Sequence, residues 1–203
     1  MRNRQGYDKN HDQRADKDFY ATPPEEAENI LQYEKLHGTI LDNSCGQGHL
    51  IKPVKEKYPD NKIIATDIAD RGYGETGLNF LSADYPYKDI DTVIMNPPFK
   101  FITEFTKKSL RIADKVVLLA QLQFLESQTR YNEIFSKNKP DRVYIYVDRI
   151  ACAINGNFDK ANSSSMTYAW IVWDNYNKEH KLEWIRRADK ENKEKLTLFG
   201  GDN

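Results

Sequence analysis

The chain has 203 residues, of which 39% are hydrophobic and 30% are charged, and its formal net charge is −1. This composition predicts one compact domain that buries a substantial core. No stretch approaches the roughly eighteen apolar residues of a membrane span, and residues 1–5 lack an apolar signal core. We therefore expect a cytoplasmic protein with no membrane association. The small net charge means that nucleic-acid binding would require a local basic face.

The first residues divide into a polar arm and the start of a helix. Residues 1–17 are mixed in charge and poor in large apolar side chains, which predicts a flexible N-terminal arm. A helix is expected after Thr22, Pro23 and Pro24, because threonine is a good N-cap and proline suits the first turn. The acidic pair that follows, residues 25–26, would stabilise the positive end of that helix.

Residues 39–50 have the pattern of a strand, a glycine-containing turn and the start of a helix. Gly46 and Gly48 would let the backbone approach a ligand closely. A glycine pair alone is a weak signal, since it also serves simply to turn a chain. Here, however, Asp42 precedes the pair, and Asp67 ends the next apolar run, where a carboxylate can accept hydrogen bonds from ribose hydroxyls.

A second candidate site follows the apolar run at residues 90–95, which predicts a buried strand that ends at Asn96-Pro97-Pro98-Phe99. The carboxyl end of such a strand is where α/β enzymes hold their ligands. The two prolines fix φ and remove two backbone donors, which leaves the Asn96 side-chain oxygen and the Pro97 carbonyl as acceptors beside an aromatic ring. This cluster can hold a planar amine and its ring, although so short a motif also occurs as an ordinary turn.

The rest of the chain alternates between the two types of element. Strands are expected near residues 39–43, 62–67, 78–82, 90–95, 115–120, 142–148 and 167–173. Helices are expected near residues 48–58, 101–112 and 123–137. This alternation predicts a parallel sheet with helices on both faces.

Four segments together resemble the class I S-adenosylmethionine-dependent amino-methyltransferases, and among these the γ-type enzymes that methylate the exocyclic N6 of adenine in DNA. The segments are residues 19–25, residues 42–48, Asp84, and the N-P-P-[YF] motif at residues 96–99. Their order separates this type from its permuted relatives. The resemblance is clear over residues 19–99 and looser over residues 115–174. It departs from the family pattern at Asn43, where the family usually has proline.

The resemblance implies a Rossmann-like α/β fold with a seven-stranded, mostly parallel sheet, helices on both faces and a reversed seventh strand beside the fifth. Residues 166–173 would supply that strand. It also implies S-adenosylmethionine as cofactor. The implied cofactor-binding residues are Tyr20, Thr22, Asp42, Ser44, Cys45, Gly46, Gly48, Asp67, Ile68, Asp84, Tyr85 and Asn96. The implied catalytic residues are Asn96, Pro97, Pro98 and Phe99. For Thr22 and Asp84, a purely structural capping role is the alternative.

The expected chemistry needs an oriented amine and no metal. Asn96 Oδ1 and the Pro97 carbonyl would accept both hydrogens of an adenine amine and favour a more pyramidal, more nucleophilic nitrogen. Phe99 would stack on a base that has been flipped out of a duplex or is already unpaired. Tyr168 or Trp170 would cover the other face of the base, unless these strand aromatics belong to the core.

The acceptor is expected to be DNA, because a Thr-Pro-Pro element precedes the cofactor loop. The same motif also suits an adenine in RNA or a glutamine side chain in a protein, and a non-catalytic binding protein of this fold is a further alternative. A basic set in the second half of the chain would contact phosphates or form ordinary solvated surface. Its members are Lys100, Arg130, Lys137, Lys139, Arg142, Arg149 and Lys160. Residues 155–165 are either a substrate loop or a flexible hairpin.

The stretch that follows Trp173 is short and charged, which favours loose or short-site specificity, as in the small stand-alone methyltransferases of phages and prophages that the chain resembles. The expected divisions are an arm at residues 1–17, a catalytic domain at 18–186 and a tail at 187–203.

Within the tail, residues 195–199 resemble the Q-L-x-L-F peptide that docks on the replication sliding clamp. Its anchors would be Leu196, Leu198 and Phe199, unless the tail folds back on its own domain. Cys45 and Cys152 are expected to be reduced and free of metal.

Overall fold

The structure of the protein is a computed structural model that describes residues 20–150, 152–154 and 166–187. Several expectations lie outside the described residues and stay predictions: the arm at 1–17, the stretch at 155–165, and the tail with its proposed anchors Leu196, Leu198 and Phe199. The division into an arm, a domain and a tail also stays a prediction.

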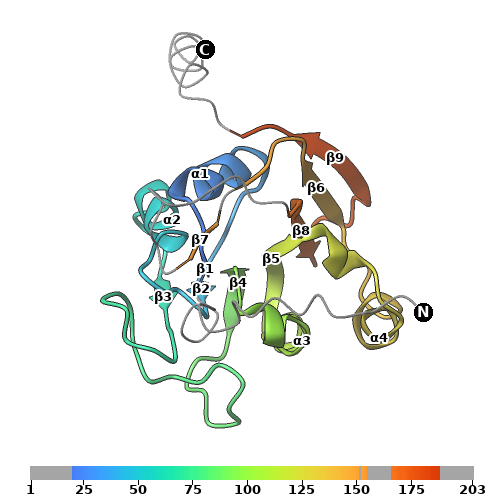
Figure 1. The fold of residues 1–203 in the computed structure, drawn as a ribbon. Coiled ribbons are helices and arrows are strands. Elements are labelled where there is room, and N and C mark those ends of the chain that lie inside the picture. The colour runs from blue at the N-terminus through green and yellow to red at the C-terminus, as the bar shows by residue number, and fades with distance from the viewer. Residues whose placement is uncertain (1–19, 151, 155–165, 188–203) are drawn as a thin grey trace, which may run out of the picture.

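Strands and helices alternate along most of the chain (Figure 1). The strands are β1 (Tyr20–Ala21), β2 (Ile40–Asp42), β3 (Ile63–Ala65), β4 (Ile90–Met95), β5 (Ala113–Gln121), β6 (Arg142–Tyr146), β7 (Ala153–Ile154), β8 (Tyr168–Asp174) and β9 (Lys181–Ile185). The helices are α1 (Pro24–Tyr33), α2 (Ile51–Lys57), α3 (Ile102–Ile112) and α4 (Gln128–Arg130). Shorter turns are the 3-10 elements η2 (Phe99–Phe101) and η3 (Leu122–Leu125) and the π-helical η4 (Tyr131–Phe135). In the described part of the chain, no helix is long and apolar enough to cross a membrane.

The main sheet has seven strands in the order β3-β2-β4-β5-β8-β6-β9. Pairing is parallel from β3 to β5 and again between β6 and β9, whereas β8 is antiparallel to both of its neighbours. Every residue of β8 is buried, as expected for an apolar strand in the middle of a covered sheet. The expected architecture is therefore confirmed: a Rossmann-like α/β fold whose seven-stranded, mostly parallel sheet has one reversed strand beside β5.

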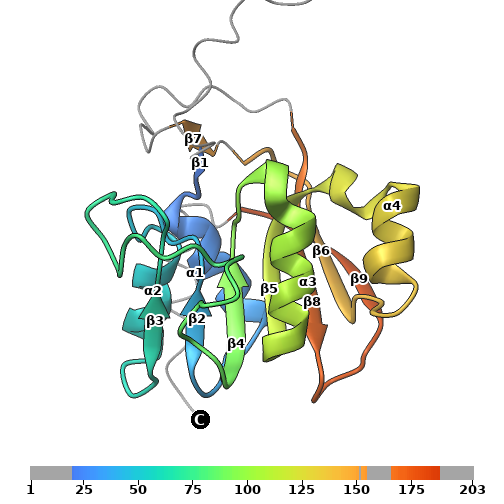
Figure 2. The ribbon, with the colours of Figure 1, turned by 90° about the horizontal axis from the view of Figure 1, so that it is seen from below.

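Helices cover both faces of this sheet (Figure 2). Buried residues of α1 and α2, including Ile30 and Val54, pack on one face against β5 and β8 side chains such as Val117 and Trp170. On the other face, α3 and η4 contribute a second core that includes Phe105. Successive strand residues alternate between the two cores, so the apolar runs of the central strands are buried on both sides.

One predicted strand, residues 78–82, is wrong. Its segment forms turns, in which Asn79 Oδ1 accepts from the Leu81 backbone N–H and Ser82 Oγ accepts from the Asp84 backbone N–H. Such local bonds compete with a strand ladder for the same backbone groups. The sheet still has seven strands, because β9, which the sequence analysis did not predict, pairs with β6 at the far side of the sheet from β3.

Two other details of the helix predictions need correction. The expected helix at 123–137 is divided into η3, α4 and η4, and the break lies at Ser127, whose φ is 129°. The helix after the prolines does begin at Pro24, as predicted, but its N-cap is Pro23 and no side chain caps it. The Thr22 hydroxyl has another partner, described below.

A cluster of four buried ionic side chains lies at the edge where the parallel strands begin. Lys115 donates to Glu34 at 2.6 Å and lies 3.1 Å from Asp174, while Arg142 pairs with both of these carboxylates. All four side chains are at least nine-tenths buried. Arg142 therefore cannot serve as a surface phosphate contact, as the sequence analysis had allowed, and it holds the end of α1 to β6 and β8 instead.

Candidate functional site

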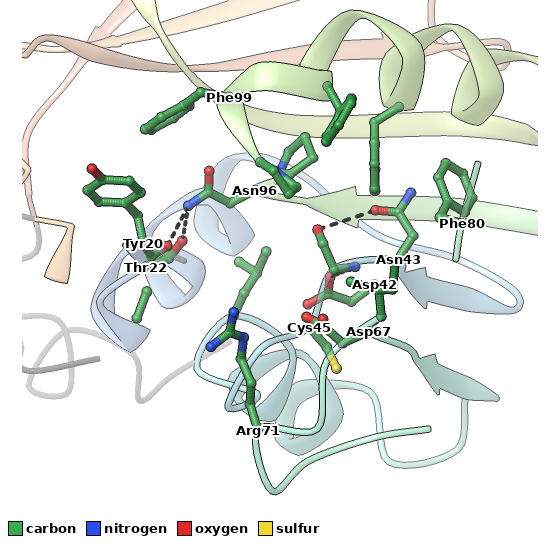
Figure 3. Close-up of a pocket in the computed structure, with 18 of the residues that line it drawn as sticks. Tyr20, Thr22, Asp42, Asn43, Cys45, Asp67, Arg71, Phe80, Asn96 and Phe99 are labelled. Atoms are coloured by element: carbon green, nitrogen blue, oxygen red, sulfur yellow. Dashed lines mark hydrogen bonds between the residues drawn. The ribbon is translucent and has the colours of Figure 1, made fainter. Parts of the chain in front are cut away.

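A cavity of about 630 Å³ lies at the opposite edge of the sheet, where β2, β3 and β4 end (Figure 3). Ligand sites of small-molecule size fall in the range of about 300–1,000 Å³. The predicted residues that line it are Tyr20, Thr22, Asp42, Ser44, Cys45, Asp67, Ile68, Asn96, Pro97, Pro98 and Phe99. The fold thus brings the two candidate motifs of the sequence to one cavity, while their roles in binding stay predictions.

The tetrapeptide from Asn96 to Phe99 forms one wall of this cavity. β4 is buried up to Met95, after which the prolines stop the ladder and η2 leads into α3. Asn96 Nδ2 donates to Thr22 Oγ1 at 2.9 Å and to the Tyr20 carbonyl at 3.3 Å. The ring of Phe99 packs against that of Tyr20, with 5.3 Å between the ring centroids.

The loop after β2 forms the floor. Gly46 and Gly48 both have positive φ, at 53° and 81°, so the turn uses the conformational freedom of glycine. Neither glycine lines the cavity; they shape the loop that presents Asp42, Ser44 and Cys45 to it. Burial raises the pKa of the Cys45 thiol, with the Asp42 and Asp67 carboxylates adding to the shift, so this cysteine is unsuited to act as a thiolate nucleophile.

Asp67 lies just beyond the end of β3 and joins the loop after β2 to the loop after β3 through hydrogen bonds. One of its carboxylate oxygens accepts from the Gly46 backbone N–H at 2.9 Å, and the other accepts from the Ala69 backbone N–H at 2.8 Å. Each carboxylate oxygen has a second lone pair, so the group can also accept hydrogen bonds from a ligand. Asp67 is therefore both a loop brace and a lining residue of the cavity.

Asp42 is the most unusual ionisable group of the site. Burial raises its pKa to about 8, and the nearby Asp67 carboxylate adds to the shift, whereas the hydrogen bond from the Ser44 backbone N–H opposes it. Within the described part of the chain its Oδ2 atom is buried and has no hydrogen-bond partner. Buried polar atoms are normally paired, so an unpaired carboxylate oxygen in a cavity wall favours a ligand that donates a hydrogen bond or carries positive charge.

The sequence analysis missed several lining residues. Phe80 and Phe105 add apolar surface, and Asn43, Asn79 and Arg71 add polar groups. The sequence did carry one signal for Phe80, the single large aromatic in the apolar run at 78–81, but that run was interpreted as strand. Arg71 had no signal, because only the folded loop after β3 turns it toward the cavity (Figure 3).

Asp84 and Tyr85 do not line the cavity, contrary to their predicted cofactor contacts. Asp84 is exposed, and its backbone N–H bonds to Ser82 Oγ. Tyr85 is buried beneath Phe80, and its hydroxyl lies 2.7 Å from Thr66 Oγ1. Residues 79–85 form turns instead of an extended strand. As a result, Asn79 lines the cavity and Asp84 does not.

Tyr168 and Trp170 do not line the cavity either, so the structure does not support their predicted stacking on a base. Both belong to the core beneath α1, and Trp170 is fully buried, with its indole N–H donating to the Tyr146 hydroxyl at 2.9 Å. A ring enclosed on both faces cannot receive a ligand. The alternative stated for these strand aromatics, a core role, is the observed one.

No family model matches the chain, and no curated protein matches its sequence. Among solved structures it is similar to a precorrin-6y C5,15-methyltransferase from Geobacter metallireducens GS-15, with a TM-score of 0.49 and 15% identity over 71% of this chain and 85% of that one. It is also similar to M. capricolum TrmK in complex with S-adenosyl-homocysteine, with a TM-score of 0.48 and 13% identity over 77% and 69% of the two chains. The plantazolicin methyltransferase BpumL, also with S-adenosyl-homocysteine, gives a TM-score of 0.43 and 12% identity over 75% and 82%. The fold assignment above rests on strand order and register.

Proposed function

We propose that the protein is an S-adenosylmethionine-dependent methyltransferase that methylates the exocyclic N6 amine of adenine in DNA, with loose or short-site specificity. The observation that carries the proposal is the position of Asn96. It directly follows β4 and lines the same cavity as Asp42 and Asp67, so a substrate amine and a nucleoside-sized methyl donor would meet there.

The cavity fits the proposed donor at both its polar and its apolar parts. The unpaired Oδ2 of Asp42 suits an ammonium group or a donor hydroxyl, and Asp67 can accept hydrogen bonds from ribose hydroxyls. Ile68, Phe80 and Phe105 provide apolar surface for an adenine ring. When bound, S-adenosylmethionine supplies an electrophilic methyl group on a sulfonium.

The residues of the chain would then orient the acceptor. Asn96 Nδ2 is already used in bonds to Thr22 and Tyr20, which leaves Oδ1 to accept a hydrogen from the amine. A second acceptor, the Pro97 carbonyl, follows in the same wall. Accepting both hydrogens draws the nitrogen toward a pyramidal geometry and stabilises the positive charge that develops on it during transfer. Phe99 would support the ring of the base.

The direct test is to incubate the purified protein with methyl-labelled S-adenosylmethionine and three separate pools: unmethylated DNA in single- and double-stranded form, RNA, and protein. The proposal expects label in DNA, recovered as N6-methyladenine after digestion to nucleosides. Label found only in RNA or in glutamine side chains would reassign the substrate and keep the chemistry. Donor binding without transfer to any pool would indicate a non-catalytic binding protein.

A further inference from the structure

The side-chain amide of Asn96 is held in one orientation by two acceptors. Its Nδ2 atom donates to Thr22 Oγ1 and to the backbone carbonyl of Tyr20 (Figure 3). A hydroxyl can donate or accept, but a carbonyl can only accept, so the atom that faces Tyr20 must be the nitrogen. Both N–H groups of the amide are thereby used. Among the residues that the structure describes, no hydrogen bond reaches Asn96 Oδ1.

The two acceptors are themselves fixed by their surroundings. Tyr20 pairs with Ile154 in the two-stranded β1–β7 sheet, which sets the direction of its backbone. Thr22 is 4% exposed and stands directly before Pro23 and Pro24, and a residue before proline is restricted to extended conformations. The Tyr20 carbonyl cannot turn away without disturbing a strand pair, and the backbone that carries Thr22 cannot turn without disturbing the start of α1.

The hydroxyl of Thr22 does not serve the helix that follows. The N-cap of α1 is Pro23, and this helix has no side-chain capping bond. The hydrogen bond that the structure does give to the hydroxyl is the one from Asn96, at 2.9 Å. A threonine chosen only to begin a helix would have its oxygen on the backbone N–H groups of the first turn.

We infer that Thr22 is a positioning residue, which together with the Tyr20 carbonyl turns Oδ1 of Asn96 toward the acceptor amine. This inference rests on the proposed function of the same cavity. If the amide rotated by half a turn, it would present an NH₂ group to an NH₂ substrate, and two donors cannot bond to each other. Thr22 thus acts through Asn96, which differs from the cofactor contact predicted for it from sequence.

The first test measures turnover and donor affinity separately. Thr22→Val keeps the shape of the side chain but removes the acceptor, and Thr22→Ser keeps the acceptor. We expect Thr22→Val to lower kcat by about tenfold, as for loss of one net hydrogen bond, with affinity for S-adenosyl-homocysteine within about twofold of wild type. Thr22→Ser should retain most of the turnover. Unchanged kcat in Thr22→Val would overturn the inference, and so would a loss confined to S-adenosyl-homocysteine affinity.

The second test asks whether the effect passes through Asn96. In an Asn96→Ala background, Thr22→Val should lower the residual turnover no further, because its target is gone. A further loss of the same size as in wild type would show that Thr22 acts on something else and would overturn the inference.

The third test does not depend on activity. In ¹⁵N-labelled protein, the side-chain NH₂ signals of Asn96 can be assigned by their absence in Asn96→Ala. Thr22→Val should shift them and speed their exchange with water, whereas Thr22→Ser should leave them close to wild type. Unchanged signals in Thr22→Val would contradict the positioning role. If the wild-type protein transferred no methyl group, the proposed function would fail, and this measurement would still decide whether Thr22 holds the amide.

Discussion

Buried carboxylates at the two ends of the parallel strands have pKa values shifted in opposite directions. At the edge where the parallel strands begin, Glu34 is buried yet its pKa is held below the usual range: burial acts to raise it, but hydrogen bonds from Arg142 and Lys115 outweigh that effect. At the edge where they end, Asp42 is also buried, and its pKa rises to about 8, because burial and the Asp67 carboxylate outweigh the hydrogen bond from the Ser44 backbone N–H. Among the described residues, burial of a carboxylate therefore goes with opposite pKa shifts, according to whether buried cations donate hydrogen bonds to it.

This contrast separates a structural cluster from a candidate ligand site. The cluster of Glu34, Lys115, Arg142 and Asp174 has two charges of each sign and satisfies them internally. The cavity keeps an unpaired carboxylate oxygen, which costs stability unless a ligand supplies the partner. The stabilising ionic cluster and the candidate ligand cavity thus lie at opposite ends of the parallel strands.

The largest expected effect is on the structural edge. Replacing Arg142 with Met should lower the free energy of unfolding by about 3–5 kcal/mol, because it leaves the buried carboxylates with too few cations. Urea unfolding measures this change. The matched control is Lys107→Met, which breaks the half-exposed pair with Glu133 and should cost less than about 1 kcal/mol. Similar losses for both variants would show that the buried cluster has no special structural weight.

The next effect is on the cavity edge and should spare stability. Asn96→Ala should lower methyl transfer by about a hundredfold or more, because it removes an acceptor that acts on the charge developing in the transition state. Binding of S-adenosyl-homocysteine, followed by calorimetry, should change little. Asn132→Ala, on the exposed part of η4, serves as the control and should keep full turnover. Full turnover in Asn96→Ala would refute the catalytic assignment.

The sequence predicted those features of the fold and the site that depend on local patterns in the chain. The α/β fold class and the meeting of Asn96 with Asp42 and Asp67 follow from apolar periodicity and from motifs, which are local properties of the chain. The reversed strand was implied only by the family resemblance. Asp42 is the last residue of β2, and Asp67 and Asn96 follow the ends of β3 and β4, so the topology brings all three to one edge.

The errors involve properties that only the folded chain decides. Residues 78–82 are apolar enough for a strand, but side-chain bonds from Asn79 and Ser82 turn the backbone, and this moves Asp84 away from the cavity. The indole of Trp170 could stack on a base, but it is fully buried in the core beneath α1. Arg142 was predicted to contact phosphates or form solvated surface, because its buried partners are distant in sequence.

A smaller effect concerns donor affinity. Asp67→Asn removes the charge and one acceptor while keeping the size of the side chain, and it should weaken S-adenosyl-homocysteine binding by about 1–3 kcal/mol. The neighbouring Asp70, whose side chain accepts from the Gly72 backbone N–H and does not line the cavity, provides the control Asp70→Asn, which should bind normally. Equal affinities in wild type and Asp67→Asn would place the ribose of the donor elsewhere.

The last expected effect is a pH dependence of stability that Asp42 causes. Its folded-state pKa, about 8, is above that of an unfolded aspartate, so protonation favours the folded chain, and stability is lost as pH rises between the two values. The ligand-free wild type should therefore lose up to roughly 1.4 kcal/mol of unfolding free energy per pH unit relative to Asp42→Asn between about pH 5 and 8.

Urea unfolding of both proteins at several pH values measures this difference, and S-adenosyl-homocysteine should reduce it by giving Oδ2 a partner. The cluster at the other edge should show the reverse sign: the pKa of Glu34 is depressed, so its contribution is present above the unfolded value and is lost in acid. A difference between wild type and Asp42→Asn that stays constant from pH 5 to 8 would mean that Asp42 is ionised and already paired, and the distinction between the two edges would then disappear.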